Sequence, residues 1–171
     1  MADLTEADGG AGAAGARAPS ITILGVGNTL MGDDGFGIFV VDGLDAEALG
    51  PGVSVIAGDT AGMALLKHFL ESDVVVVVDA MAAEAEPGAI FRFVPDEAGI
   101  MNLRSNNIHG MGVPHLVTNA RLMGADPQVT VFAVQVGSVQ PRNLELTPPV
   151  ESAVERVREL IAAEVAQLLG N

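Results

Sequence analysis

Side chains of the types that bind metals or transfer protons lie at the expected ends of strands and in the expected loops of this chain. Asp33 and Asp34 follow an apolar run and a glycine-rich loop, Asp79 closes a run of five valines, and His109 lies in a glycine-flanked polar loop. Two carboxylates and an imidazole form a ligand set suited to zinc, nickel or manganese, with positions left open for substrate or water. We therefore take Asp34, Asp79 and His109 as the candidate catalytic and metal-binding residues.

The glycine-rich loop before Asp34 has the shape of a phosphate-binding loop but the opposite charge. Such loops direct backbone N–H groups at an anion, which the adjacent carboxylates of Asp33 and Asp34 would repel. The dinucleotide pattern also fails, because Leu30 stands where a third glycine should follow Gly25 and Gly27. A nucleotide-binding domain is thus the weaker alternative.

Apolar runs with strand character alternate with helical patterns along the chain. The expected strands cover residues 20–26, 53–57, 73–79, 88–94 and 129–136, and the expected helices cover about 35–49, 61–71, 112–123 and 148–169. This alternation predicts an α/β fold with a mostly parallel sheet. Only eight residues separate Asp79 from strand 88–94, too few for a helical crossover, so this strand should be antiparallel or at an edge.

The predicted topology places several acidic residues at one rim of the sheet. Ligands of open α/β sheets gather beyond the carboxyl ends of the parallel strands. Asp34 and Asp59 follow the first two strands and Asp79 closes the third, so all three should share that rim. The loop 104–112, which carries His109, could reach the same place.

Each polar candidate also has a structural interpretation that the sequence leaves open. An aspartate at a helix start can cap the helix, an aspartate at a strand end can be solvated, and a histidine in a loop or helix can be structural. These alternatives apply to Asp33, Asp34, Asp59, Asp79, His109 and His115.

Length and composition favour one folded domain. A chain of 171 residues with 49% hydrophobic residues and a mean hydropathy of +0.42 can fill a core. Residues 1–19 lack apolar periodicity and are predicted to form a flexible N-terminal extension to a single α/β domain at 20–171. No membrane span and no signal peptide are predicted, so we expect a cytoplasmic protein.

Charge and residue usage exclude several function classes. With 22 acidic and 8 basic residues, the net charge of −14 disfavours nucleic acids and anionic membranes as partners. The chain has no cysteine, which excludes disulfides and thiolate chemistry. Metal-assisted chemistry is the interpretation that remains.

An ordered series of motifs extends from residue 21 to about residue 155. It comprises Gly25-Val26-Gly27-Asn28, Gly32-Asp33-Asp34-Gly35-Phe36-Gly37, Gly58-Asp59-Thr60-Ala61-Gly62, Val78-Asp79-Ala80, Pro87-Gly88, Ile108-His109 and Leu146-Thr147-Pro148. Taken together, the series resembles the hydrogenase maturation endopeptidases, which trim the C-terminus of the nickel-iron hydrogenase large subunit.

This resemblance implies a fold, a site and a substrate. It implies a five-stranded twisted sheet between helices, and it places the family's three metal-contacting positions on Asp34, Asp79 and His109. The first position is Glu or Asp in the family, so Asp34 is an allowed variant. Nickel would arrive with the large-subunit precursor, no organic cofactor would be needed, and one peptide bond would be hydrolysed to release a C-terminal extension.

Two further functions stay open beside this endopeptidase. A non-catalytic, nickel-sensing assembly factor for the hydrogenase large subunit would need the same three residues. A magnesium-dependent phosphohydrolase would also place carboxylates at the rim, but it would normally need a basic residue near the phosphate. Lys67, on a predicted helix, is the only lysine of the chain.

Overall fold

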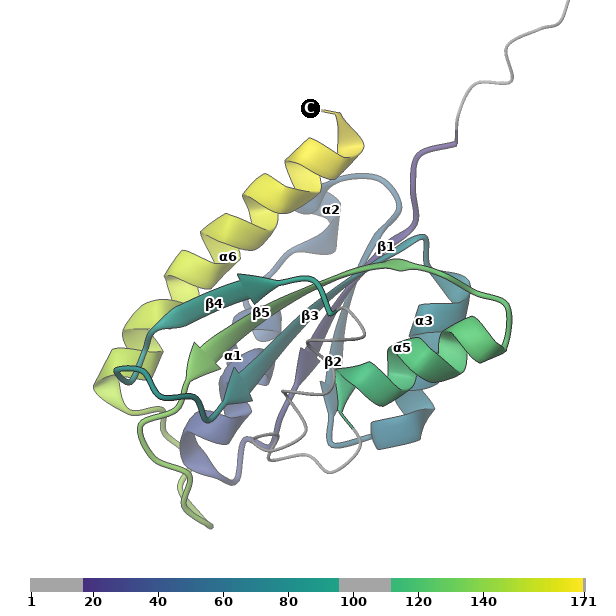
Figure 1. Cartoon of the computed structure of the whole chain (residues 1–171). Helices are drawn as coiled ribbons and strands as arrows, with labels where there is room; N and C mark the ends of the chain where they lie inside the picture. The colour runs from purple at the N-terminus through teal and green to yellow at the C-terminus, as the bar shows by residue number, and fades with distance from the viewer. Residues whose placement is uncertain (1–16, 96–111, 171) are drawn as a thin grey trace, which may run out of the picture.

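A five-stranded sheet with helices on both faces forms the body of the molecule (Figure 1). This computed structural model describes residues 17–95 and 112–170. The strand order is β2-β1-β3-β5-β4, and every neighbouring pair is parallel except β4 with β5. The predicted α/β fold with a mostly parallel sheet and an antiparallel edge strand is therefore confirmed.

The strands agree with the sequence prediction to within two residues at each end. The strands are β1 (Ile21–Val26), β2 (Val53–Asp59), β3 (Val74–Met81), β4 (Ile90–Phe93) and β5 (Gln128–Gln135). The helices are α1 (Phe36–Asp42), α2 (Ala46–Leu49), α3 (Leu66–Glu71), α5 (Val113–Leu122) and α6 (Pro148–Leu169), with 3-10 turns η1 (Gly32–Gly35) and η2 (Gly62–Leu65).

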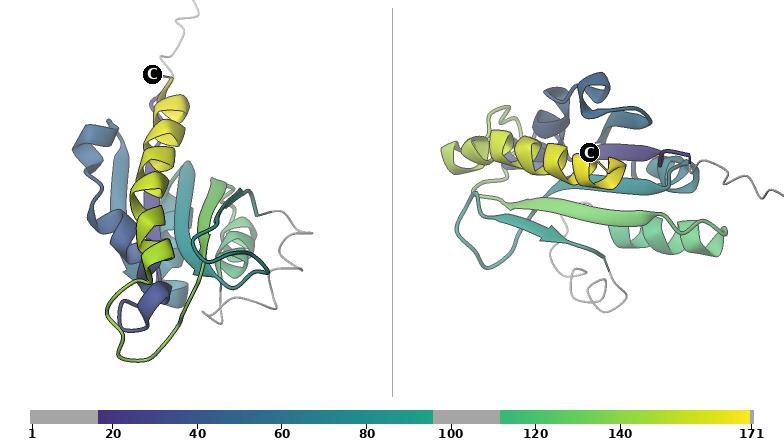
Figure 2. Two further views of the ribbon diagram at one scale, coloured as in Figure 1. Left: turned by 90° about the vertical axis from the view of Figure 1, so that its left-hand side faces the viewer. Right: turned by 90° about the horizontal axis from the view of Figure 1, so that it is seen from above.

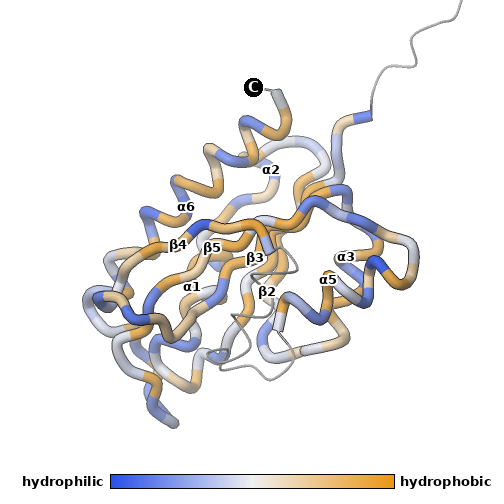
Figure 3. The backbone as a smooth tube through the Cα atoms, in the orientation of Figure 1, coloured by the Kyte–Doolittle hydropathy of each residue, from blue (hydrophilic) through white to orange (hydrophobic). Residues whose placement is uncertain are grey.

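The sheet is the middle layer of three (Figure 2). Helices α1, α2 and α6 cover one face, whereas α3 and α5 cover the other. Each face has its own buried core, and the strands between them are the most apolar part of the chain (Figure 3). The buried residues of α5 and α6 are all apolar, as expected for amphipathic helices that cover a core.

Strand β3 lies at the centre of the sheet and explains the run of valines. Val76 and Val78 pack in the core under α1 and α6, whereas Val75 and Val77 pack in the core under α3 and α5. A strand covered on both faces needs apolar residues at every position. Because side chains alternate along a strand, Asp79 follows Val75 and Val77 toward the α3–α5 face.

Helix α1 approaches the sheet closely because two glycines face each other there. A Cβ at Gly37 would lie 2.3 Å from the carbonyl oxygens of both Val26 and Val78. A Cβ at Gly25 would lie 2.3 Å from the carbonyl oxygen of Gly37. The start of α1 therefore contacts the ends of β1 and β3 through backbone atoms.

Two of the predicted helices are less regular than the sequence prediction. The predicted helix 35–49 is wrong as one unit, because η1 precedes α1 and the chain breaks between α1 and α2. The break includes Gly43, and the Asp45 carboxylate then caps α2 by accepting hydrogen bonds from the N–H groups of Glu47 and Ala48. The predicted helix 61–71 likewise begins with the 3-10 turn η2.

Helix α6 has the predicted bounds and the predicted apolar stripe. Val150, Val157, Ile161 and Val165 are buried on its inner side. Thr147 occupies the N-cap position, but its side chain makes no capping hydrogen bond because the hydroxyl is used elsewhere. Within the described parts of the chain, no helix is long and apolar enough to cross a membrane.

Candidate functional site

The candidate site lies where neighbouring strands send the chain to opposite faces of the sheet. From the carboxyl end of β1 the chain continues into α1 on one face of the sheet. Strand β2, the neighbour of β1 on the side away from β3, leads to α3 on the opposite face. Strands β1 and β3 are parallel neighbours, with Gly25 paired to Val78. The turn η1 carries Asp33 and Asp34 and contacts β3, which carries Asp79. The predicted meeting of Asp34 and Asp79 at one rim therefore agrees with the topology.

Glycines allow the loop after β1 to fold back tightly on η1. Gly27 has a φ of +140°, and a Cβ there would lie 2.0 Å from the carbonyl oxygen of Asp34. The same carbonyl accepts a hydrogen bond from Asn28 N at 3.2 Å. Gly32, with a φ of +66°, begins η1. These residues need the backbone freedom of glycine to place Asp34 at the end of β1.

Asp33 is a structural residue with a fully buried carboxylate. Its Oδ2 accepts hydrogen bonds from Gly137 N at 2.7 Å, Ser138 N at 2.8 Å and Thr147 Oγ1 at 2.9 Å. Its Oδ1 accepts one from Thr147 N at 2.6 Å. The interpretation of Asp33 as a helix cap is wrong, since this carboxylate fixes the β5–α6 connection to η1.

Asp34 is also buried, with 1% of its surface exposed. The residue makes no side-chain cap for α1, whose N-cap residue is Gly35. It lies in η1, which packs against β3. The neighbouring carboxylates of Asp33 and Asp34 therefore have different surroundings.

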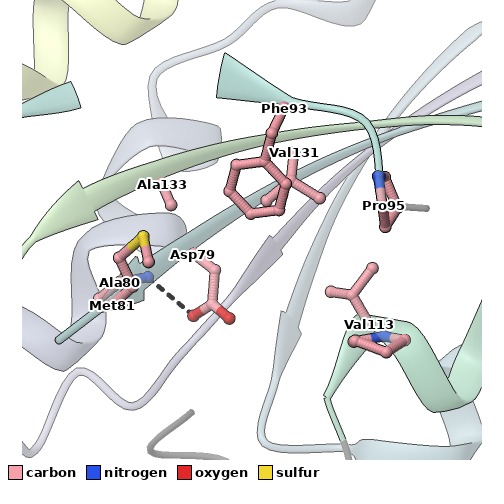
Figure 4. Close-up of a pocket in the computed structure, with 9 residues that line it drawn as sticks. Asp79, Ala80, Met81, Phe93, Pro95, Val113, Val131 and Ala133 are labelled. Carbon is pink, nitrogen blue, oxygen red and sulfur yellow. Dashed lines mark hydrogen bonds between the residues drawn. The ribbon is translucent and has the colours of Figure 1, made fainter. Parts of the chain in front are cut away.

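Asp79 borders an apolar pocket between the sheet and α5 (Figure 4). Its Oδ1 accepts a hydrogen bond from Ala80 N at 2.8 Å, and the residue is half-buried. The pocket is small, with a volume of about 20 Å³. Its walls include Met81, Phe93, Pro95 and Val113, so that apolar surface surrounds the acidic end. This arrangement places apolar surface next to a carboxylate.

Two of the remaining candidate residues, Asp59 and His115, lie at exposed positions. Asp59 is exposed at the end of β2 with a φ of +46°, and the N-cap of η2 is Ala61 without a side-chain bond, so the capping role predicted for Asp59 is wrong. His115 is exposed on α5. His109 lies outside the described residues, so its predicted role stays a prediction. Within the described ranges there is no cluster of three His, Cys, Asp or Glu residues that could hold a metal ion.

Comparison with known proteins connects this geometry to a family. A family model described as hydrogenase maturation protease matches residues 38–164. The chain belongs to the hydrogenase maturation protease family. The hydrogenase 2 maturation protease of Escherichia coli (strain K12) is 29% identical over 150 residues, which cover 86% of this chain and 91% of that protein.

Members of the hydrogenase maturation protease family with related sequences also share the fold. A putative hydrogenase maturation protease of Methanocaldococcus jannaschii is 31% identical over 149 residues, covering 85% of this chain and 96% of that protein. The solved structure of the hydrogenase maturating endopeptidase HybD from E. coli matches with a TM-score of 0.73 and 30% identity. The match covers 86% of this chain and 92% of that structure.

Two features of this site were absent from the sequence interpretation. The donors to Asp33 come from residues more than 100 positions away, and only Thr147 belonged to a recognised motif. The pocket walls come from β3, β4, β5 and α5. The alternation of side chains along β3 could have placed Met81 beside Asp79, because residues two apart share a face.

Proposed function

We propose that this protein is an endopeptidase that removes the C-terminal extension of a nickel-iron hydrogenase large-subunit precursor after nickel insertion. The observation that supports the proposal is that the turn η1, which carries Asp34, contacts β3, which carries Asp79, in a chain of the hydrogenase maturation protease family. Nickel would arrive with the substrate, and no organic cofactor is required. The proposed location of the reaction is the cytoplasm.

The chain path supports His109 as the third member of the site. Val113, the first residue of α5, lines the same pocket as Asp79. Three residues separate His109 from Val113 in the sequence, and four residues of extended chain span at most about 14 Å. This short separation along the sequence supports the proposal of His109 as the third member of the site.

The donor chemistry fits a nickel ion presented by the substrate. Carboxylate oxygens and an imidazole nitrogen are ligands that divalent nickel accepts, and three of them leave positions open for the groups of the substrate. A bound divalent metal polarises a carbonyl or lowers the pKa of a bound water. In the hydrolysis, water adds to the scissile carbonyl carbon, the C–N bond breaks, and the departing amine takes up a proton.

The pocket beside Asp79 supplies a way to position the substrate. Its apolar walls can bury an apolar side chain of the precursor, which stabilises a complex by roughly 25 cal/mol per Å² of apolar surface. The half-buried carboxylate at the border of this pocket would then lie close to the bound chain. We propose that an apolar residue near the scissile bond occupies it.

The proposal is tested by intact-mass analysis of the large-subunit precursor. Nickel-loaded and nickel-free precursor would each be incubated with the parent protein and with a His109→Ala variant. We expect loss of one defined C-terminal peptide from the nickel-loaded precursor with the parent protein only. If the masses stay unchanged while a complex still forms with the nickel-loaded precursor, the protein is a non-catalytic, nickel-sensing assembly factor and the proposed activity is wrong.

A further inference from the structure

A second hollow, which we call the α1–α6 groove, lies on the opposite face of the sheet from the Asp79 pocket. It has a volume of about 740 Å³ and is formed by α1, α6 and residues 144–148. Phe39, Leu146 and Val154 give it an apolar, partly buried floor, and Leu144 at its edge is 60% exposed. Exposed leucine beside an apolar groove is typical of a surface that binds another chain.

The polar residues of the α1–α6 groove are mostly acidic. Glu145, Glu151 and Glu155 line it together with a single cation, Arg158. The Arg158 guanidinium donates hydrogen bonds to the carbonyl oxygens of Phe39 at 2.7 Å and Val40 at 3.0 Å, and it also pairs with Glu155. Among the described residues, Glu145 and Glu151 have no ion-pair partner. The groove therefore presents negative charge over an apolar floor.

The α1–α6 groove lies next to the turn η1, which carries Asp33 and Asp34. Phe39 lies against Gly35, the residue after Asp34, because a Cβ at Gly35 would lie 3.3 Å from Cε2 of the Phe39 ring. On the other side, Thr147 stands within the 144–148 segment and donates two hydrogen bonds to Asp33. A polypeptide that occupies the groove would thus approach the turn η1 from the side opposite the Asp79 pocket.

We propose that the α1–α6 groove is a docking surface for a segment of the protein substrate that combines basic residues with an apolar anchor. The inference rests on the proposed function, since it takes the substrate to be a polypeptide that also reaches Asp34 and Asp79. Basic side chains would pair with Glu145 and Glu151, and an apolar side chain would cover Leu144 and Phe39. Docking there would hold the substrate at a second place, separate from the bond to be cleaved.

The test measures the dissociation constant of the purified large-subunit precursor in an Asp79→Asn background, which separates binding from cleavage. A Glu145→Lys/Glu151→Lys variant reverses the groove charges. A Glu47→Lys/Glu71→Lys variant makes the same change in net charge at exposed residues of α2 and α3 that lie outside the groove. We expect about tenfold weaker binding for the groove variant and less than a twofold change for the control, with the difference shrinking at high salt.

Milder variants keep the test informative if the lysines disturb α6. Glu145→Gln/Glu151→Gln removes charge without reversing it and should weaken binding about threefold, and Leu144→Ala should do the same through lost apolar contact. Equal weakening by the groove and control lysine variants would overturn the inference, as would unchanged binding by all groove variants. Loss of self-association in the groove variant alone would assign the groove to a second copy of this chain and also overturn it.

Cleavage is measured separately, in the Asp79 parent. If that protein cleaves nothing while the groove variants still lose affinity for the precursor, the proposed activity fails and the docking surface stands. If cleavage occurs and affinity is insensitive to the groove, the docking surface fails and the activity stands.

Discussion

The two strand ends that carry the candidate carboxylates are built in opposite ways. At the end of β1, glycines bring backbone against backbone, Asp33 is fully hydrogen-bonded, and Asp34 is buried in a turn. At the end of β3, Asp79 is half-buried at the border of an apolar pocket. The β1 end is fixed by backbone packing and a fully buried, hydrogen-bonded carboxylate, whereas the β3 end borders a pocket.

We infer from this difference that residues at the β1 end stabilise the site, whereas residues at the β3 end contact the substrate. Substitutions on the β1 side should lower the free energy of unfolding, because they remove packing or hydrogen bonds. Substitution of Asp79 itself should change substrate handling with a smaller loss of stability.

Gly37→Ala should give the largest loss of stability, about 3 kcal/mol, because the new methyl group would overlap two backbone oxygens. Chemical denaturation measures the loss. Gly124→Ala is the control, since no atom lies within 4 Å of a Cβ there and only its φ of +88° is unfavourable. It should cost about 1 kcal/mol. Equal costs for the two variants would show that α1 does not rest on the sheet through Gly37.

Asp33→Ala should lower the free energy of unfolding by about 2 kcal/mol, because the four hydrogen bonds from Gly137, Ser138 and Thr147 lose their acceptor. Asp79→Ala should cost less, about 1 kcal/mol, because Asp79 is only half-buried whereas Asp33 is fully buried. Thermal and urea unfolding of both variants check the contrast. Equal losses of stability for Asp79→Ala and Asp33→Ala would show that the two strand ends do not differ in this way.

Phe93→Ala should raise the KM for the precursor about tenfold, because this ring forms a wall of the Asp79 pocket. Phe91→Ala is the matched control: Phe91 lies on the same strand and packs against the same core, but it does not line the pocket. Both variants should lose about 2 kcal/mol of stability. If steady-state kinetics give the same KM for both variants, the pocket takes no part in substrate binding.

A smaller effect is expected far from the site, at Asp73. Hydrogen bonds from the backbone N–H and hydroxyl of Ser20, together with Arg17, hold the pKa of Asp73 below its ordinary value. The stabilisation should therefore be complete at neutral pH and disappear as the pH falls below about 4, through the depressed pKa. Unfolding of Asp73→Asn and parent protein between pH 7 and pH 3 should converge at the acidic end. A constant difference would contradict this account.

The arrangement of strands and the rim of carboxylates were predictable from local sequence. Continuous valines before Asp79 indicate a strand buried on both faces, and the short connection after it predicts the antiparallel edge. Helix α6 was also predictable, because its apolar residues recur at helical spacing over its whole length. These features depend on residues close together in the chain.

The rest of the site depends on contacts between distant segments. The sequence around Asp33 is equally compatible with a helix cap, and only the folded β5–α6 connection brings Gly137 and Thr147 to it. The break between α1 and α2 follows from Gly43 and the Asp45 cap, which compete with helical periodicity over 35–49. The pocket combines residues from four elements, and no local pattern specifies such a combination.

A single-turnover reaction on the nickel-loaded precursor, followed by intact mass, compares Asp79→Asn with the parent protein. We expect the parent to release a C-terminal peptide, and Asp79→Asn to release none while its unfolding curve matches that of the parent. Cleavage by Asp79→Asn at the rate of the parent would contradict the claim that this strand end acts on the substrate.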